Sequence, residues 1–256
     1  MGIFGKLFAK KDSFIDPVDL KHLKTDLHSH LIPGIDDGSP DMETSIMLLK
    51  RFIDLGYQKV ITTPHIMSDY YRNTPEIINK GLDLVRKEID AQELNIEIDA
   101  AAEYNLEPNF VSLLKEKNIL SFGPQNYVLF ELSFFEEPPD LNETIWLMRD
   151  QGYTPVLAHV ERYAYWHLDT DKYEEMINRG VKLQLNIGSV TGAYGLEVKR
   201  VANQLIKDNI IDFIGSDCHH EQHLEMISYA SKLPIFHQLV HQLSLIHISE
   251  PTRRQQ

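Results

Sequence analysis

The sequence TDLHSHLIPGIDDG, at residues 25–38, is the stretch that most constrains the fold. It begins as a short strand-like run, places His28 and His30 two positions apart, and ends in a turn-forming Asp-Asp-Gly. Side chains two positions apart in an extended segment point to the same side. Both histidines therefore face one way, and they are either unrelated loop residues or part of a metal site.

Length and composition favour one α/β domain. The chain has 256 residues, an ordinary length for a single barrel, and 43% of them are hydrophobic, which is enough for a sizeable core. The formal net charge of -13 argues against a nucleic-acid partner, since no basic stripe offsets it. No run approaches the ~20 apolar residues of a membrane-spanning helix, so we expect no transmembrane segment.

Any metal site in this chain must use nitrogen and oxygen ligands. The single cysteine, Cys218, excludes an internal disulfide and a thiolate cluster, and it fits a reducing cytoplasm. The 12 His and 38 acidic residues supply imidazole and carboxylate groups, which suit zinc, manganese or iron.

Both ends of the chain are expected to lie outside the domain. Residues 1–24 are predicted to form an N-terminal extension, whose basic start, MGIFGKLFAKK, is solvated in the preferred interpretation and weakly membrane-associated in the alternative. Lys6 does not fit the myristoylation pattern. Residues 243–256 begin LSLIHISEPTR, which looks like a translated transposon-end sequencing adapter, so we interpret them as a foreign tail. The domain is then residues 25–242, and the helix begun by LPIFHQLVHQ is expected to be cut short.

Short apolar runs alternate with longer segments of helical period, which predicts a parallel sheet with crossover helices. Ser39 and Pro40 are the expected cap and first turn of one helix, which Gly56 ends. Thr74 and Pro75 repeat the start signal for a second helix that reaches about residue 92.

Six of about seven predicted strands end in a side chain that can bind a metal. The segments and their terminal residues are TDL with His28 and His30, KVITT with His65, IEIDAAA with Glu103, YVLF with Glu131, TPVLA with His159, and DFIGS with Asp217 and His219. Only KLQLN, ending near Asn186, lacks one. Each residue alone reads as a solvated loop or turn. Because the carboxyl ends of barrel strands converge on one face, their joint placement predicts a metal cluster.

So many donors exceed the needs of one zinc ion and indicate a site for two or three ions. Such sites activate water and stabilise both oxygens of an in-line phosphoryl displacement, so hydrolysis of a phosphate ester is the expected reaction. Arg162 follows one strand end and is expected to bind phosphate, with a surface ion pair as the alternative. Several aromatic residues either line a mouth for an aromatic group or pack beneath loops: Tyr163, Tyr165, Trp166, Tyr70, Tyr71, Phe134 and Phe135.

Other routes to phosphoryl chemistry are absent from the sequence. A thiol-based phosphatase needs an arginine six residues after its cysteine, and Cys218 has Leu224 in that position. A GxxxxGK[ST] phosphate-binding loop is also missing.

As an ordered set, these motifs resemble the PHP (polymerase and histidinol phosphatase) superfamily. The resemblance is strongest to the bacterial tyrosine-protein phosphatases of capsular and exopolysaccharide synthesis. It rests on DLHSHLIPGIDDG, TTPH, AAEY, FELS, AHVERY and GSDCHH, which span residues 25 to about 220. It implies a distorted (β/α)7 barrel of the PHP type and three divalent metal ions, with manganese expected and iron or zinc as alternatives.

Carried onto this chain, the resemblance implies three ligand groups. They are His28, His30, Glu103 and Asp217 for one ion, Glu103, Glu131 and His159 for a second, and Asp37, His65 and His219 for the third. Arg162 would bind phosphate with Tyr163 beside it, and Asp37 or a metal-bound water would assist the leaving group. Some relatives carry a further arginine after the last motif, and here His220 or His223 would take its place.

The activity that the resemblance implies is removal of phosphate from the tyrosine-rich tail of a membrane tyrosine autokinase that regulates polysaccharide synthesis. The expected location is the cytoplasm, with the inner face of the membrane as an alternative, and the oligomeric state is left open. A small-molecule phosphatase such as a histidinol phosphatase is the first alternative. A metal-stabilised binding protein without turnover is the second, and a nuclease is disfavoured by the acidic charge.

Overall fold

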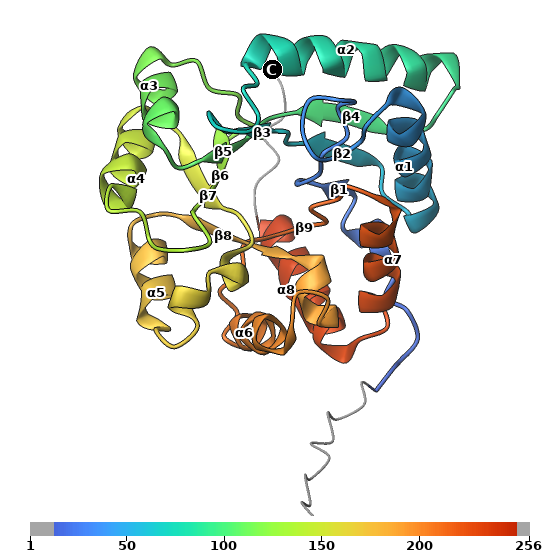
Figure 1. The fold of residues 1–256 in the computed structure, drawn as a ribbon. Helices are drawn as coiled ribbons and strands as arrows, with labels where there is room; N and C mark the ends of the chain where they lie inside the picture. The colour runs from blue at the N-terminus through green and yellow to red at the C-terminus, as the bar shows by residue number, and fades with distance from the viewer. Residues whose placement is uncertain (1–12, 250–256) are drawn as a thin grey trace, which may run out of the picture.

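Parallel strands form two adjoining sheets that curl into a distorted barrel, with helices packed around the outside (Figure 1). The structure, a computed structural model, describes residues 13–249. The strands are β1 (Thr25–Asp26), β2 (Lys59–Thr62), β3 (His65–Ile66), β4 (Glu97–Ala100), β5 (Glu103–Asn105), β6 (Tyr127–Glu131), β7 (Thr154–Leu157), β8 (Lys182–Asn186) and β9 (Phe213–Gly215). The helices are α1 (Met42–Leu55), α2 (Pro75–Ala91), α3 (Pro108–Glu116), α4 (Leu141–Asp150), α5 (Asp171–Asn178), α6 (Leu196–Lys207), α7 (Glu221–Ala230) and α8 (Pro234–Ser249). Short 3-10 turns are η1 (Leu20–His22), η2 (Val160–Arg162), η3 (Ala164–Trp166) and η4 (Ile187–Thr191).

The sheet topology confirms the predicted distorted barrel. The strand orders are β1-β2-β4 and β3-β5-β6-β7-β8-β9, and each of these pairs is parallel. A parallel bridge between Ser29 and Cys218 joins the segment after β1 to the segment after β9. The first and last strands of the chain are therefore neighbours, and the carboxyl ends of all strands lie at one face.

Two predicted strands are each divided in two. The segment KVITT to His65 splits into β2 and β3, and the segment IEIDAAA to Glu103 splits into β4 and β5. Pro64 lies at the first break, where it has no N–H to donate to a neighbouring strand. Its carbonyl still accepts from the Glu103 amide at 3.1 Å, which starts the second sheet. The division moves His65 and Glu103 into the sheet that carries most of the site.

The alternation of side chains along the strands places the carboxylates on the inner face of the barrel. A small core cluster includes Ala101 and Leu129, whereas the neighbouring Ala102 and Val128 belong to the large core cluster beneath the helices. Glu103 and Glu131 each follow an inner residue by two positions, and both are buried. The period of two therefore carries each carboxylate onto the top of the inner core.

One of two predicted helix starts is correct. Thr74 caps α2 by accepting from the Ile77 amide at 3.3 Å, and Pro75 occupies its first turn, as expected. The cap of α1 is Asp41, which accepts from the Thr44 amide at 2.8 Å, so the predicted Ser39 cap is wrong by two residues. Ser39 is instead buried, and its amide donates to the His30 carbonyl at 3.0 Å, which holds the loop beside the first histidines.

Parts of both predicted end segments pack against the domain. The amides of Ile15 and Val18 donate to the carbonyls of Lys232 and Ser231, and Leu20 is buried in the core. Residues 13–24 therefore belong to the fold, and the basic start of the predicted extension lies outside the described residues. Helix α8 continues to residue 249, and Leu243, the first residue of the predicted foreign tail, is buried. That the tail is foreign stays a prediction.

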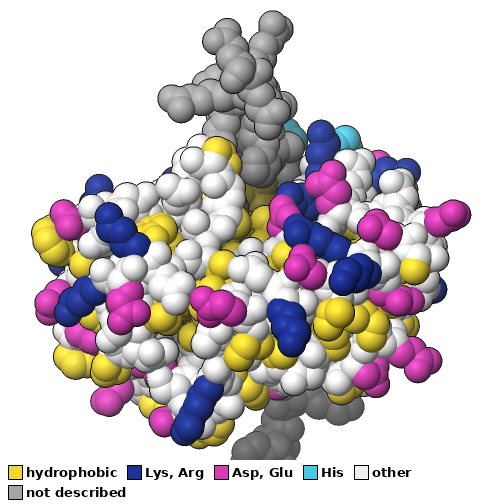
Figure 2. All heavy atoms as spheres, turned by 90° about the horizontal axis from the view of Figure 1, so that it is seen from above, with side chains coloured by type: hydrophobic (Ala, Val, Ile, Leu, Met, Phe, Trp, Pro, Cys, Tyr) yellow, Lys and Arg dark blue, Asp and Glu magenta, His cyan; other side chains and the backbone are white. Residues whose placement is uncertain are grey.

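None of the helices in the described part of the chain is both long and apolar enough to span a bilayer. On the face seen in Figure 2, Lys and Arg side chains are interspersed with Asp and Glu.

Helix α2 packs closely on the segment that follows His30. A Cβ atom at Gly81 would lie 2.2 Å from Cγ2 of Ile32, a fully buried side chain. The change Gly81→Ala should therefore lower the free energy of unfolding by about 1–2 kcal/mol, although alanine is the better helix former.

Urea unfolding followed by circular dichroism measures this change. Lys80→Ala, at an exposed neighbouring position, is the control and should leave the midpoint nearly unchanged. A higher midpoint for Gly81→Ala would contradict the close packing.

Candidate metal centre

All nine predicted metal ligands meet at the carboxyl face of the barrel. Seven of them line one open cavity of about 390 Å³, namely Asp37, His65, Glu103, Glu131, His159, Asp217 and His219. His28 and His30 are fully buried beneath them. The cavity is also lined by Arg162, Phe134, Tyr194, His220 and His223. Residues almost two hundred positions apart in the sequence therefore share one site.

The donor atoms form three groups, within each of which all donors lie within 4.8 Å of one another. The groups are His28, His30, Glu103 and Asp217; His30, Asp37, His65 and His219; and His65, Glu103 and Glu131. The first has the membership that the resemblance implied, and the second adds His30 to the expected three. In the third, His65 takes the place expected for His159, whose Nε2 instead lies 2.9 Å from Glu103 Oε1 and 3.8 Å from Glu131 Oε2.

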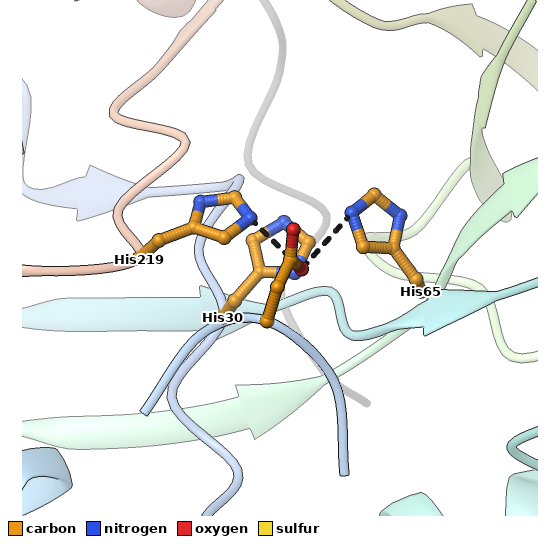
Figure 3. A group of neighbouring side chains, drawn as sticks. His30, His65 and His219 are labelled. Atoms are coloured by element: carbon orange, nitrogen blue, oxygen red, sulfur yellow. Dashed lines mark ion pairs between the residues drawn. The ribbon is translucent and has the colours of Figure 1, made fainter. Parts of the chain in front are cut away.

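Figure 3 shows how the second group is assembled from separate segments, with His30, His65 and His219 surrounding one carboxylate. The Nε2 atoms of His219 and His65 lie 3.3 and 3.6 Å from Asp37 Oδ1. The His30 and His219 rings are stacked with centroids 3.9 Å apart. Asp37 is half exposed at the cavity wall, so this group is the one most open to solvent.

Buried hydrogen bonds fix the orientation of the two deepest histidines. His28 Nδ1 lies 3.1 Å from Gln184 Oε1, and His30 Nδ1 lies 2.8 Å from Asp36 Oδ2. Each bond leaves the Nε2 atom of the ring facing the donor cluster, which is how ligand histidines are usually held. Gln184 also accepts from the His159 amide at 2.9 Å, so one amide side chain positions two of the nine residues.

The backbone is strained or tightly packed where the ligands lie. His159 and Asp217 have φ values of 35° and 51°, the left-handed region that non-glycine residues rarely adopt. A Cβ at Gly38 would lie 2.2 Å from the His30 carbonyl oxygen, and one at Gly215 would lie 2.5 Å from the His28 Cβ. These two glycines allow the chain to pass directly against the first two histidines.

Asp217 connects the donor cluster to Arg162. Its Oδ1 lies 3.4 Å from His28 Nε2 and 3.5 Å from His30 Nε2. Its Oδ2 accepts from Arg162 Nη1 at 3.0 Å and from Asn186 Nδ2 at 2.9 Å. One carboxylate oxygen therefore faces the metal-competent donors while the other holds the guanidinium at the cavity wall.

Buried carboxylates and imidazoles in the cluster shift one another's pKa values, because each favours the charged form of the other. Burial raises the pKa of Glu103, but the imidazoles of His28 and His65 lower it more, so that its pKa lies well below its usual range. Burial lowers the pKa of His28, yet Glu103 and Asp217 raise it to about 9. Asp37 has a pKa of about 2, since its contacts with His219 and His65 outweigh partial burial. Asp37 is therefore a carboxylate at neutral pH, which suits a ligand better than the expected proton donor.

The donor set fits divalent metal ions. His30 Nε2 and His65 Nδ1 are buried inside the cluster without a hydrogen-bond partner. A buried polar atom without a hydrogen bond is costly, and a metal ion coordinated between these nitrogens and the nearby carboxylates would remove that cost.

The expectation that Tyr163 contacts the substrate is wrong. Its side chain is fully buried, and its hydroxyl donates to the Ala158 carbonyl at 3.1 Å and accepts from the Leu132 amide at 3.0 Å. Trp166 is also buried, with its indole donating to Glu137. The turn that directs Arg162 into the cavity sends the next residue into the core. Of the predicted aromatic set, Phe134 lines the cavity.

Several residues that shape the site were not predicted as functional. Asp36 was interpreted only as a turn residue, and Gln184 and Asn186 lie on β8, the strand without an ionisable end. Their side-chain amides form hydrogen bonds to the predicted ligands His28 and Asp217 and so orient them. One indication was available for these two residues: β8 lies between β7 and β9, and each of those strands is followed by a predicted ligand. Tyr194, in the loop after β8, had no sequence signal.

The fold and the site together define a parallel α/β barrel with a cluster of metal-competent donors at its carboxyl face. The model of the family described as "Capsular polysaccharide synthesis, CpsB/CapC" matches residues 24–226, and the chain belongs to this family. This finding confirms the resemblance inferred from the motifs.

Curated relatives are named as phosphatases. The chain is 26% identical over 195 residues to the tyrosine-protein phosphatase YwqE of Bacillus subtilis, covering 76% of this chain and 77% of the relative. It is 26% identical over 194 residues to the putative tyrosine-protein phosphatase CapC of Staphylococcus aureus, covering 76% of each. A solved structure from work on YwqE of Bacillus subtilis and CpsB of Streptococcus pneumoniae, described as metal-dependent tyrosine phosphatases, has a similar fold. It aligns with a TM-score of 0.76 at 24% identity, covering 90% of this chain and 97% of that one.

The role of Gln184 can be tested by metal affinity. The change Gln184→Leu keeps the volume but removes the acceptor for His28 and for the His159 amide, so the affinity for manganese should fall about 10- to 100-fold. Competition with a fluorescent chelator measures the affinity. Gln204→Leu, on the exposed side of α6, should bind like the unchanged protein, and equal affinities for all three proteins would refute the orienting role.

Proposed function

We propose that this protein is a metal-dependent protein-tyrosine phosphatase. The observation that carries this function is the cavity itself, in which seven metal-competent side chains and Arg162 face one open space. Divalent ions held by the three donor groups would supply Lewis-acid stabilisation of the phosphate and activation of water. The names of the curated relatives support the same activity.

Arg162 is suited to bind the phosphate. Its side chain is only 24% exposed and lies at the cavity wall, with Nη1 donating to Asp217. A planar guanidinium binds two phosphate oxygens at once, and its low exposure limits competition from water. Asp217, which also accepts a hydrogen bond from Asn186, keeps it fixed beside the donors. The positive charge of Arg162 then offsets the protein's acidic net charge at the place where an anionic substrate binds.

The leaving group needs little help from a protein acid. A tyrosine phenol has a pKa of ~10, far below that of an alkyl alcohol, so it leaves readily without full protonation. This agrees with the ionised state of Asp37 and with its use as a ligand. Cys218 is fully buried, and burial raises the pKa of its thiol well above the usual range, so it does not serve as a nucleophile.

The proposed physiological substrate is the phosphotyrosine-bearing tail of a membrane tyrosine autokinase that regulates polysaccharide synthesis. The family to which the chain belongs supports a role in capsular polysaccharide synthesis. The cavity is open to solvent at the Asp37 side, which suits a phosphotyrosine presented on a peptide. A cytoplasmic location, the side on which such a tail would lie, and three bound ions are part of this proposal.

Substrate and metal dependence are tested together. With manganese, the protein should hydrolyse a phosphotyrosine peptide with kcat/KM at least about tenfold above that for histidinol phosphate, because the open cavity admits an aryl phosphate on a chain. Phosphate release measured with malachite green gives the turnover of both substrates. Adding a chelator should abolish turnover, and restored manganese should recover it. Equal or better turnover of histidinol phosphate would overturn the substrate assignment.

Two single variants separate metal from thiol chemistry. His159→Ala removes an imidazole beside Glu103 and should lower kcat/KM on the order of 100-fold or more. Cys218→Ser should retain activity within about twofold, because a buried, protonated thiol takes no part in the reaction. Circular dichroism checks that both variants fold. A folded but inactive Cys218→Ser protein would contradict the metal mechanism.

A further inference from the structure

The cavity contains an aromatic surface among ionisable side chains. Of the described residues that line it, Phe134 and Tyr194 are the two with carbocyclic rings, and the others are Asp, Glu, His or Arg. Phe134 is 42% exposed, although apolar rings of this size are usually buried. A phenyl ring does not itself bind phosphate or metal, so its exposure at the wall of a charged cavity needs another explanation.

Phe134 lies between the metal donors and the phosphate-binding group. Its ring centroid is 5.5 Å from that of His159 and 4.9 Å from the guanidinium carbon of Arg162. A phosphate ester bound by Arg162 beside the donors would therefore lie next to this ring. An aromatic group there would meet the exposed part of Phe134, whereas a small alkyl group would not reach it.

Tyr194 is a second aromatic contact of Arg162. The guanidinium carbon lies 4.6 Å from the Tyr194 centroid, so the cation contacts two rings. Gly188 makes room for this arrangement, because a Cβ there would lie 2.9 Å from Tyr194 Cε2. Since Tyr194 stabilises the cation independently, Phe134 is not the only support of Arg162 and is available to contact a ligand.

We infer that Phe134 forms a binding subsite for the aromatic ring of an aryl phosphate, and thereby selects phosphotyrosine over alkyl phosphates. This inference rests on the phosphatase function proposed above and names the feature of the substrate that the site recognises. The contact is an offset or edge-to-face pair between the substrate ring and Phe134, with the phosphate on Arg162.

Two phosphonates that cannot be hydrolysed test the subsite by binding alone. Phenylphosphonate and methylphosphonate carry the same anionic group, and only the first has a ring. Isothermal titration of the manganese-loaded protein should show that Phe134→Ala weakens phenylphosphonate binding about tenfold and leaves methylphosphonate binding unchanged. Phe134→Tyr should restore the preference. Phe135→Ala is the matched control, because this neighbouring ring is 95% exposed and does not line the cavity.

The possible outcomes separate the subsite from a supporting role. Equal weakening of both phosphonates would mean that Phe134 acts only by holding Arg162, and it would overturn the inference. Unchanged binding of both would also overturn it. If the unchanged protein prefers phenylphosphonate through Phe134 but hydrolyses no phosphotyrosine, the proposed function fails while the subsite stands. If the protein hydrolyses phosphotyrosine but binds both phosphonates equally well, the subsite is overturned and the proposed function stands.

Discussion

The structure depends on one buried carboxylate, that of Glu103, surrounded by four imidazole rings. Its oxygens lie 3.1 Å from His28, 3.4 Å from His30, 3.3 Å from His65 and 2.9 Å from His159. Removing a charged group from water costs several kcal/mol, and only close partners of opposite charge offset this cost. Protonated histidines or metal ions must therefore occupy the surroundings of Glu103 in the folded state. Metal ions bound at these imidazoles would therefore stabilise the fold, since a ligand that binds only the native state stabilises it.

The sequence was sufficient to predict the barrel and the members of the donor cluster. Glu103 and Glu131 lie at the carboxyl ends of two predicted strands, and parallel strands bring such ends together whatever the details of packing. The start of α2 was also predictable, because Thr74 accepts a local hydrogen bond from the Ile77 amide and Pro75 has the fixed φ that suits the first turn of a helix. Features set by local chemistry or by the topology of the whole barrel are thus accessible without coordinates.

Features set by the packing of particular side chains were not predictable. Tyr163 was expected in the cavity but turns inward, since the direction of the chain after Arg162 depends on the η2 turn and on the left-handed conformation of His159. Gln184 carries no charge and matches no motif, yet it orients two ligands through one amide oxygen. The division of strands near Pro64 could be located from the proline, but the shift of the chain into a second sheet could not.

The bridge between Ser29 and Cys218 has a consequence for biosynthesis. Asp26 accepts hydrogen bonds from the Ser216 amide and hydroxyl, across a separation of 190 residues. During synthesis His28 and His30 emerge from the ribosome long before Asp217 and His219 have been made. An incomplete polypeptide therefore holds only part of the donor set. Without the segment after β9, two of the three donor groups are incomplete. Only insertion of β9 beside β1 brings together all the donors that tight cation binding would require.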